Sequence, residues 1–451
     1  MVEGNQMDRA IVIGASMSGL LAARVLADHF AQVIVVERDQ MPPHGMPRKG
    51  VPQGRHAHVL LAHGLALLEG FFPGLSAELA GRGALVGDMS ETSRWYSGGA
   101  YSPNFRSGLR GMQVSRPLLE GTIYKRVCDL PNVTILENHD AAGLLTERKG
   151  TDVCVTGVRV VNRSTGQPVE KDLTADLVVD AAGRGSRILV WLEALGYTRP
   201  EEEHIKVNLT YTTREFRRLP EHAGGKSPIV ILASLANPRG GVMLAAEGDR
   251  WIVTLAGIMG VAAPTDLDGF IEFARTLDAP DIYNVLKTAE PLGEGSQYKY
   301  PASQRRRFEK LARFPEGLLV VGDAMCSFNP IYGQGMTTAA SEAVLLGECL
   351  RIGTGDANGS LRRRFFREAS RLLDSPWAIA AGSDLAFPEV EGKRSRAGAL
   401  VGAYLTQLLI ASRKDTSLNV AFQRVTNLMD PPQSLFRPGV VWRVIRARFS
   451  R

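Results

Sequence analysis

The sequence predicts an α/β fold that contains a parallel sheet, an inserted antiparallel sheet and a helical C-terminal region. Residues 9–39 read as strand, helix and strand, and this order implies that the two strands pair in parallel. Residues 206–258 consist of short β-rich runs separated by Pro and Gly, and several runs alternate as in an antiparallel sheet with one solvated face. The last hundred residues follow helical periodicity.

The composition is that of a globular protein with room for two or three domains. The chain has 451 residues, of which 44% are hydrophobic and 22% are charged. The formal net charge is +6, but the basic residues are spread along the chain, so nucleic-acid binding is not expected. The two tight basic runs begin at Arg305 and Arg362, and we expect both to be solvated faces.

The cysteine pattern favours a reducing compartment over a metal site. The four cysteines are widely spaced without a C-x-x-C pair, so no metal is expected. The first apolar run begins at Ala10 with no basic segment before it, and no apolar run is long enough to span a bilayer. We therefore expect a cytoplasmic protein with buried thiols at Cys128, Cys154, Cys326 and Cys349.

The turn after the first strand has the pattern of a dinucleotide-binding loop. Gly14 to Gly19 spell G-x-G-x-x-G with Ser16 in the second slot, and Ser18 lies at the start of the helix. Gly14 allows a tight turn, Ser16 is small enough for a pyrophosphate to approach, and Gly19 allows close helix packing. Glu37 ends the second strand, where an acid binds a ribose hydroxyl. The alternative is a packed βαβ unit without a ligand.

A second stretch, "GLLVVGDAMCSFNPIYGQGM", predicts the other end of a longer cofactor. A buried strand ends at an acid that can accept a hydrogen bond from a ribityl hydroxyl. Proline stiffens the approach, and two glycines at a helix start let backbone N–H groups lie against a flat ring. NAD needs only the first loop, so the two stretches together predict FAD. The residues of this second site are Asp323, Pro330, Gly333, Gly335 and Met336.

Together these stretches resemble the flavoprotein monooxygenases of the para-hydroxybenzoate hydroxylase-like fold. "RKGVPQGRHAHVLL", "VSRPLLEGTIYKRV" and "SPWAIAAGSDLAFPEVEG" are similar to the polyene epoxidases of polyether-antibiotic pathways (lasalocid and monensin type), and more distantly to squalene epoxidase. The resemblance implies a Rossmann-type, glutathione-reductase-like FAD-binding domain. It also implies that a C4a-hydroperoxyflavin, formed with O2, transfers one oxygen atom to a lipophilic polyene, polyketide or terpenoid, most readily as an epoxidation.

The resemblance also implies roles for individual residues. Glu37, with Arg38 beside it, would contact the adenosine ribose. Arg48 and Arg116 would reach the cofactor phosphates or the ribityl chain, and the alternative for each is a surface ion pair. Residues Gln53, Arg55 and His56 would lie beside the isoalloxazine, and the alternative there is a turn that opens a helix at His56.

The resemblance divides the chain into four parts. Residues 1–200 and 306–351 would form the FAD-binding domain, 201–305 the substrate domain and 352–451 the C-terminal helices. The segment from Ser90 to Phe105 would form a flexible wall or hairpin of the pocket. We expect the final stretch "VVWRVIRARFSR" to pack its Val, Trp and Ile on the body and to solvate its arginines; contact with a membrane is the less favoured alternative.

One segment departs from the pattern of aromatic hydroxylases. Where those enzymes carry an Asp used by both flavin and NADPH, "DLVVDAAGRGSRI" has Ala182, and Asp180 is expected to serve the strand end. No second G-x-G-x-x-G exists, so NADPH either docks directly without a motif or supplies electrons through a separate flavin reductase.

Other activities of this fold remain as alternatives. They are an aromatic or polyketide hydroxylase, a double-bond reductase and an FAD-fold binding protein without redox activity. The W-x-W-x-I-P signature of flavin halogenases is absent.

Overall fold

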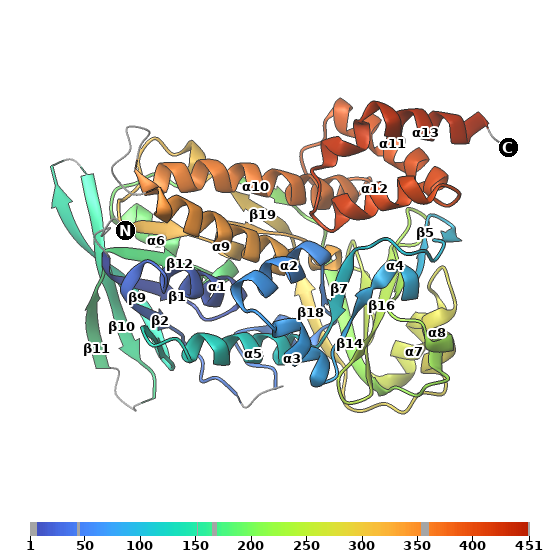
Figure 1. Ribbon diagram of the computed structural model, residues 1–451, viewed down its shortest axis with the longest axis horizontal. Helices are drawn as coiled ribbons and strands as arrows, with labels where there is room; N and C mark the ends of the chain where they lie inside the picture. The colour runs from blue at the N-terminus through green and yellow to red at the C-terminus, as the bar shows by residue number, and fades with distance from the viewer. Residues whose placement is uncertain (1–6, 43–45, 151, 165–168, 353–359, 450–451) are drawn as a thin grey trace.

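A five-stranded parallel sheet forms the centre of the molecule, in the order β20-β12-β1-β2-β8. The computed structural model describes residues 7–42, 46–150, 152–164, 169–352 and 360–449 (Figure 1). The sheet confirms the predicted parallel unit and brings the second cofactor stretch to the same sheet as the first. Its strands are β1 (Met7–Ile13), β2 (Phe30–Val36), β8 (Val133–Leu136), β12 (Leu177–Asp180) and β20 (Leu318–Val320).

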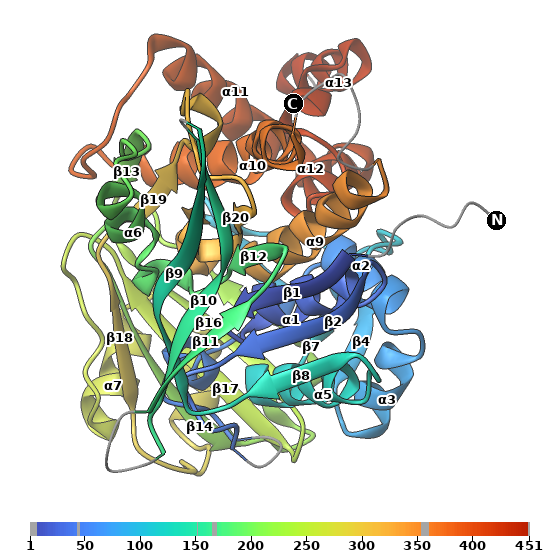
Figure 2. The same cartoon turned by 90° about the vertical axis from the view of Figure 1, so that its left-hand side faces the viewer.

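Both faces of this sheet are covered, which explains why its strands read as continuous apolar runs. Helix α1 (Met17–Leu26) contacts both α5 (Arg116–Cys128) and α9 (Gly335–Arg351) on one face. A three-stranded antiparallel sheet lies across the other side (Figure 2). Its strands are β9 (His139–Lys149), β10 (Asp152–Asn162) and β11 (Val169–Thr174).

The predicted antiparallel insertion is a seven-stranded sheet, in the order β18-β14-β17-β16-β15-β5-β6. Helices α7 (Leu267–Arg275) and α8 (Asp281–Leu286) pack against it over a separate core that includes Trp251 and Phe270. The sheet also takes in the predicted hairpin from the Ser90–Phe105 segment, which lies outside the 201–305 range. Its strands are β5 (Arg94–Ser97), β6 (Ala100–Tyr101), β14 (Leu209–Arg217), β15 (Ile229–Ile231), β16 (Arg239–Ala246), β17 (Arg250–Gly257) and β18 (Ser296–Tyr300).

Smaller elements join the two large sheets. The connecting segments form two three-stranded antiparallel sheets, in the orders β13-β19-β21 and β3-β7-β4. Their strands are β3 (Val59–Leu60), β4 (Leu85–Asp88), β7 (Arg110–Gln113), β13 (Glu202–Ile205), β19 (Ser303–Arg306) and β21 (Cys326–Ser327). The remaining short helices are α2 (Ala62–Phe71), α3 (Leu75–Gly81), α4 (Met89–Thr92) and α6 (Ile188–Ala194).

The C-terminal region is helical, as predicted, but it divides into two parts. Helix α10 (Leu361–Asp384) buries Phe365 and Trp377 in the main core. Helices α11 (Arg396–Ser412), α12 (Thr416–Thr426) and α13 (Pro438–Phe449) form a separate lobe with a small core of their own (Figure 1). Within the part of the chain that the structure describes, no helix is both long and apolar enough to cross a membrane.

The prediction that both arginine runs are solvated is wrong. Arg305 is only 2% exposed, because its guanidinium donates to the Ser370 carbonyl oxygen at 2.8 Å and pairs with Asp374 at 2.7 Å. Arg364 is also buried and donates to the Cys349 carbonyl oxygen at 2.7 Å. These side chains connect strands and helices across the core, where acidic and carbonyl partners offset the loss of hydration.

Two further expectations are corrected. All four cysteines are free thiols, but Cys128 is exposed and Cys154 is half-buried. No helix opens at His56, because that residue follows a 3-10 turn (Pro52–Arg55) and leads into strand β3. The helix of this stretch, α2, begins only at Ala62.

Candidate active site

A cavity of about 720 Å³ extends from the β1–α1 turn to the seven-stranded sheet. Its wall includes parts of both predicted cofactor stretches, so the fold brings together segments three hundred residues apart. Of the sequence-predicted residues, these line the cavity: Gly14, Ser16, Ser18, Glu37, Arg38, Arg48, Gln53, His56, Arg116, Asp323, Pro330, Gly333, Gly335 and Met336.

The β1–α1 turn requires its glycines. Gly14 has φ +99°, and a Cβ there would lie 2.8 Å from the Ala181 carbonyl oxygen. A Cβ on Gly19 would lie 1.8 Å from the Gly14 carbonyl oxygen, so Gly19 packs behind the turn and does not line the cavity. The first N–H groups of α1, beside Ser16 and Ser18, are left open toward the cavity.

Glu37 is buried and held in one orientation. Its carboxylate accepts from the Ala15 N–H at 2.7 Å and the Asp39 N–H at 2.9 Å, and it pairs with Arg48 at 2.9 Å. Burial alone would raise the pKa of Glu37, but the Arg48 charge and these hydrogen bonds outweigh burial and hold the pKa below its ordinary value. Glu37 is therefore a fixed carboxylate at the strand end, as a ribose hydroxyl requires.

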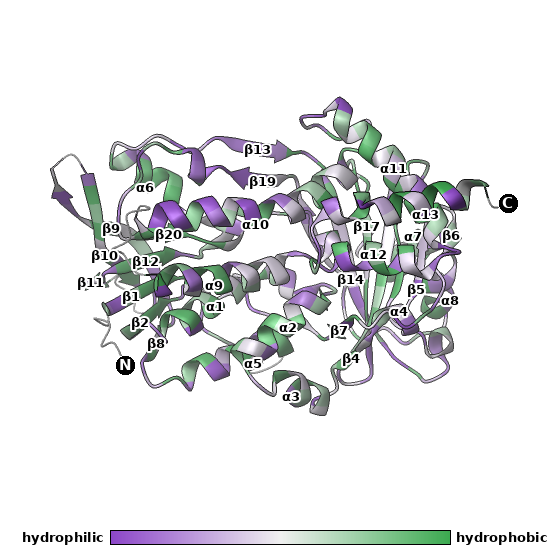
Figure 3. Cartoon of the chain, turned by 45° about the horizontal axis from the view of Figure 1, so that its top comes forward, coloured by the Kyte–Doolittle hydropathy of each residue, from purple (hydrophilic) through white to green (hydrophobic). Residues whose placement is uncertain are grey.

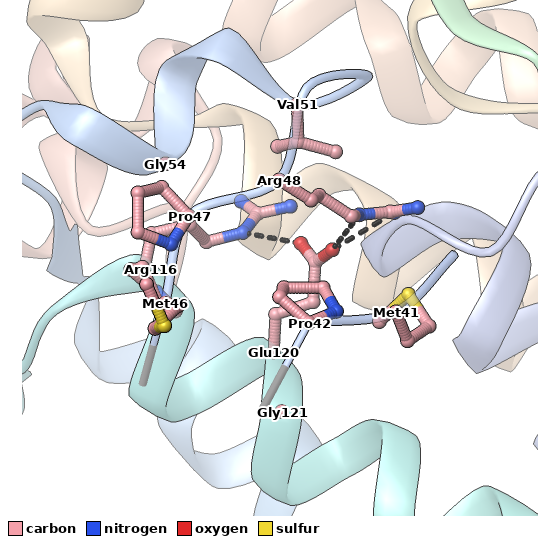
Figure 4. A pocket seen from close by; sticks show the side chains of 11 residues that line it. Met41, Pro42, Met46, Pro47, Arg48, Val51, Gly54, Arg116, Glu120 and Gly121 are labelled. Carbon is pink, nitrogen blue, oxygen red and sulfur yellow. Dashed lines mark hydrogen bonds and ion pairs between the residues drawn. The ribbon is translucent and has the colours of Figure 1, made fainter. Parts of the chain in front are cut away.

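A buried acid that the sequence reasoning missed fixes the two arginines. Glu120, on α5, accepts from Arg48 Nε at 3.0 Å and from Arg116 Nε at 2.7 Å, so its carboxylate lies between both guanidinium groups (Figure 4). Arg116 also donates to Ser16 Oγ at 3.2 Å, and Arg48 donates to the Ala15 carbonyl oxygen at 2.9 Å. The alternative of surface ion pairs is therefore wrong for both arginines.

The second stretch forms a rigid turn at the start of α9. The Gly322 N–H donates to Glu342 at 2.9 Å, and Gly333 adopts a left-handed φ of +66°. Burial raises the pKa of Glu342 to about 8, so this carboxyl is mostly protonated at neutral pH. Burial also raises the pKa of Asp323, although Arg184 and Arg116 oppose that rise.

The donor set at this end of the cavity fits FAD. Two helix N-termini, those of α1 and α9, face the cavity with open N–H groups, and α1 contacts α9. Arginines, the donors that a pyrophosphate needs, predominate here, although Glu120 offsets part of the charge of Arg48 and Arg116. The charged lining residues comprise five arginines and three acids. They are Arg38, Arg48, Arg116, Arg184, Arg187, Glu37, Asp140 and Asp323.

In the segment that departs from the hydroxylase pattern, Asp180 serves the strand end, as predicted, while Ala182 and Arg184 line the cavity. The Asp180 side chain accepts from the Ala182 N–H at 3.0 Å and from the Ser186 hydroxyl, which closes the turn after β12. Arg184 follows, lies over the Tyr300 ring at 4.5 Å and donates to Ser327 Oγ at 2.8 Å. No sequence pattern indicates this contact, because Ser327 is 143 residues away.

His56 connects the cavity-lining loop of residues 50–59 to the seven-stranded sheet. Its Nδ1 lies 2.8 Å from Thr213 Oγ1, which lies 2.6 Å from Thr254 Oγ1, and the Ala57 N–H donates to Thr254 at 3.1 Å. The arrangement that uses every hydroxyl hydrogen has Thr213 donating to Nδ1, which leaves the proton of the neutral ring on Nε2. Burial lowers the pKa of His56 to about 3, so the ring is neutral.

Two tyrosines complete this polar patch, and one predicted neighbour lies apart from it. The His56 ring meets Tyr211 edge-on at 4.5 Å and lies 6.1 Å from Tyr298, and all three residues line the cavity. Gln53 lines the cavity as well. Arg55 is exposed and is not among the lining residues.

The far wall of the cavity carries no charge. Residues 209–300 contribute side chains from β14 to β18, and residues 89–109 add Trp95 and its neighbours, but no charged residue of these two ranges lines the cavity. The apolar side chains of this wall are Met89, Trp95, Leu109, Leu209, Val230, Ile231, Leu232, Val242, Leu244 and Ile258.

Comparisons with known proteins identify the family. A family model described as FAD binding domain matches residues 8–372. The chain is 33% identical to protein Rv3254 of Mycobacterium tuberculosis over 95% of this chain and 91% of that protein. It is 26% identical to kynurenine 3-monooxygenase of Salinispora tropica over 76% of this chain and 72% of that enzyme.

A solved structure shares the fold. That of PqsL, a probable FAD-dependent monooxygenase of Pseudomonas aeruginosa, superposes with a TM-score of 0.60 at 17% identity, over 84% of this chain and 96% of that one.

Proposed function

The chain belongs to the FAD-binding-domain family of flavoproteins and is an FAD-dependent oxidoreductase, and on this premise we propose that it is a monooxygenase that inserts one atom of O2 into a neutral, lipophilic alkene. When bound, FAD supplies the redox chemistry and the activation of O2. The protein supplies the binding site, the orientation of the substrate and the exclusion of water.

The observation that carries the proposal is the uncharged wall opposite the cofactor residues. A substrate that bears a carboxylate or an ammonium group needs a charged partner when it is buried. The wall from residues 209–300 offers apolar side chains and a few neutral hydroxyl and imidazole groups. This favours a neutral polyene, polyketide or terpenoid over a charged amino acid such as kynurenine, for which the 26% relative is named.

The His56 patch gives the substrate a direction. His56, Tyr211 and Tyr298 supply polar groups where the cofactor end meets the apolar wall, and Gln53 and Thr254 also line the cavity. A polar group of the substrate would bind there, while its hydrocarbon part lies along β15 and β16. The double bond is thereby held near the cofactor end, and epoxidation of such an alkene is the specific reaction that we propose.

An aromatic or polyketide hydroxylase is the second candidate. The support for it is the 26% identity to a named monooxygenase of an aromatic amino acid. The two candidates differ in product, because an epoxidase adds oxygen across an alkene while a hydroxylase forms a phenol or alcohol. Electrons come from NADPH, and anaerobic mixing with NADPH in the absence of a reductase separates direct reduction from delivery by a reductase.

Oxygen-18 labelling tests the proposal. The FAD-loaded protein is incubated under labelled O2 with a chemical or enzymatic supply of reduced flavin and a panel of neutral polyenes. We expect one labelled oxygen atom in the product, detected by mass spectrometry. Oxygen that derives from water, or reduction of the double bond without oxygen, would refute the monooxygenase assignment.

A further inference from the structure

The C-terminal lobe has an unusually apolar outer surface. We define this lobe as residues 393–449, which include α11, α12 and α13. Leu400 is 74% exposed, Trp442 is 64% exposed and Phe449 is 81% exposed. The other large hydrophobic residues exposed on the lobe are Val401, Ile410, Met429, Phe436 and Ile445. Monomeric proteins seldom expose so many apolar side chains on one unit, so this surface indicates an interaction site.

Helix α13 carries apolar residues on two opposite stripes, which corrects the expectation that its Trp and Ile pack on the body. Val440, Val444 and Ala447 recur at helical spacing and pack into the lobe's core. Trp442, Ile445 and Phe449 recur at i, i+3 and i+7, and all of them are exposed. The colouring of Figure 3 shows hydrophobic segments on this outer helix. Residues 450–451 lie outside the described residues.

The positive charge of the chain is concentrated in the same region. Residues 393–451 contain eleven Lys and Arg but only two acids, so this segment carries a formal charge of +9, whereas the preceding residues sum to −3. The basic residues are therefore not evenly spread, as the sequence analysis had it. A helical unit that joins exposed aromatic residues to a high positive charge is typical of proteins that bind an anionic lipid surface.

Both acids of the lobe are already paired. Asp415 pairs with Arg443 at 3.1 Å, and Asp430 pairs with Arg424 at 2.7 Å. Four further basic residues of the lobe are exposed and form no ion pair with the described residues: Lys393, Arg396, Lys414 and Arg437. The charge that they present is thus available to an external anion.

The lobe also borders the substrate cavity. Gln423, Thr426 and Asn427 of the α12 region line it, and the Asn427 side chain accepts from the Ala62 N–H at 3.0 Å. Leu232 and Ile331 line the cavity and are also more than a third exposed, so the cavity meets the surface at an apolar rim.

We propose that the outer face of the C-terminal lobe docks on an anionic membrane surface, with the α13 stripe inserted among the headgroups and the free basic residues against the lipid phosphates. The inference goes beyond oxygen insertion, since docking requires no turnover. The docking lobe also contributes Gln423, Thr426 and Asn427 to the cavity wall.

Vesicle co-sedimentation tests this docking surface. The full FAD-loaded chain is mixed with vesicles of phosphatidylcholine and phosphatidylglycerol, or of phosphatidylcholine alone, at low and high salt. We expect binding to the anionic vesicles and little binding to the neutral ones. High salt should release the protein, because it screens the basic residues. The triple variant W442S/I445S/F449S should bind at least about tenfold more weakly.

Two control variants make the test specific. V169S/V190S/L219S removes three exposed apolar side chains from outside the lobe and should bind as the original chain does. K414Q/R437Q should lower only the salt-sensitive part of the binding. Retained FAD absorbance and unchanged circular dichroism establish that each variant is folded.

Three results would overturn the proposal. One is no binding to anionic vesicles. Another is equal loss of binding in the control and lobe variants. The third is that the original chain does not bind vesicles but forms a dimer, seen by light scattering, or a complex with DNA, and that the triple variant loses this association. Oxygen-insertion activity is not measured here, so failure of this proposal and failure of the monooxygenase assignment are distinguishable.

Discussion

Arg48 has the most demanding position of any single residue in the site. Its guanidinium is shared by the Glu37 and Glu120 carboxylates, which are both buried. Removing one partner of a buried pair leaves the other charge uncompensated. Arg116, in contrast, pairs with Glu120 alone among the acids of the described chain.

We therefore predict that R48M lowers the free energy of unfolding by about 3–5 kcal/mol, because it leaves the buried Glu37 carboxylate without a cation, although Glu120 keeps Arg116 as its partner. Urea denaturation of the apoprotein measures this change. R116M is the matched control and should be clearly less destabilising, since Glu120 keeps Arg48 as its partner. Equal losses in the two variants would contradict the assignment of Arg48 as the shared partner.

R116M should instead affect cofactor recognition. A charge-assisted hydrogen bond to a phosphate contributes about 1.5–3 kcal/mol, so the affinity for FAD should fall roughly tenfold or more. Riboflavin lacks the phosphates and should bind the variant as well as it binds the original protein. Fluorescence quenching titrations with both ligands check this, and parallel losses would show that Arg116 does not face the phosphates.

Glu342 gives a pH-dependent prediction. Its pKa is about 8 in the folded protein and 4.5 ordinarily, so between these values the folded state holds a proton that the unfolded state has lost. Stability from this group is full below pH 4.5 and is lost as the pH rises to about 8. E342Q cannot titrate at this position. The difference in melting temperature between E342Q and the original chain should therefore shift in favour of E342Q as the pH rises from 6 to 9. A difference in melting temperature that stays constant over this pH range would contradict the buried, protonated state of Glu342.

At the scale of elements, the strand–turn–helix unit of β1 and α1 decides where the cofactor can lie. Its turn was predictable because the constraint is local: the same few residues set φ, the helix start and the packing distance. The strand before Asp323 and the start of α9 were predictable for the same reason, although the strand ends at Val320 and Asp323 lies in the 3-10 turn that follows. Two other contacts were not predictable, because they join residues far apart in the chain. Arg48 and Glu120 are 72 positions apart, and His56 and Thr213 are 157 positions apart.

G14A tests this turn. Alanine is strained at φ +99°, and its Cβ would meet the Ala181 carbonyl oxygen at 2.8 Å, so the turn must shift or the unit must lose about 2 kcal/mol of stability. G99A is a control with positive φ but no neighbour within 4 Å of the added Cβ. The thermal unfolding temperature should be lower for G14A than for G99A, and the affinity for FAD should fall only in G14A. Unchanged FAD affinity in G14A would remove the turn from the cofactor site.

At the scale of the whole molecule, the parallel sheet, the inserted sheet and the C-terminal helices followed from the sequence, but the contacts between them did not. Hydrophobic periodicity shows that a helix such as α13 is amphipathic, yet a helix with two apolar stripes does not reveal which stripe is covered. The prediction for the arginine runs was wrong for a related reason, since composition cannot tell a solvated guanidinium from the buried one of Arg305, which pairs with the exposed Asp374. The 201–305 substrate range likewise omits the strands that come from Arg94–Tyr101.

The central claim is that one FAD molecule lies in the cavity between the β1–α1 turn and the start of α9. The most direct measurement is a fluorescence titration of the apoprotein with FAD. The account predicts saturable quenching with one FAD per chain and a clearly weaker response to riboflavin, which cannot reach the Glu37, Arg48 and Arg116 end. An apoprotein that leaves FAD fluorescence unchanged at all concentrations would contradict the account.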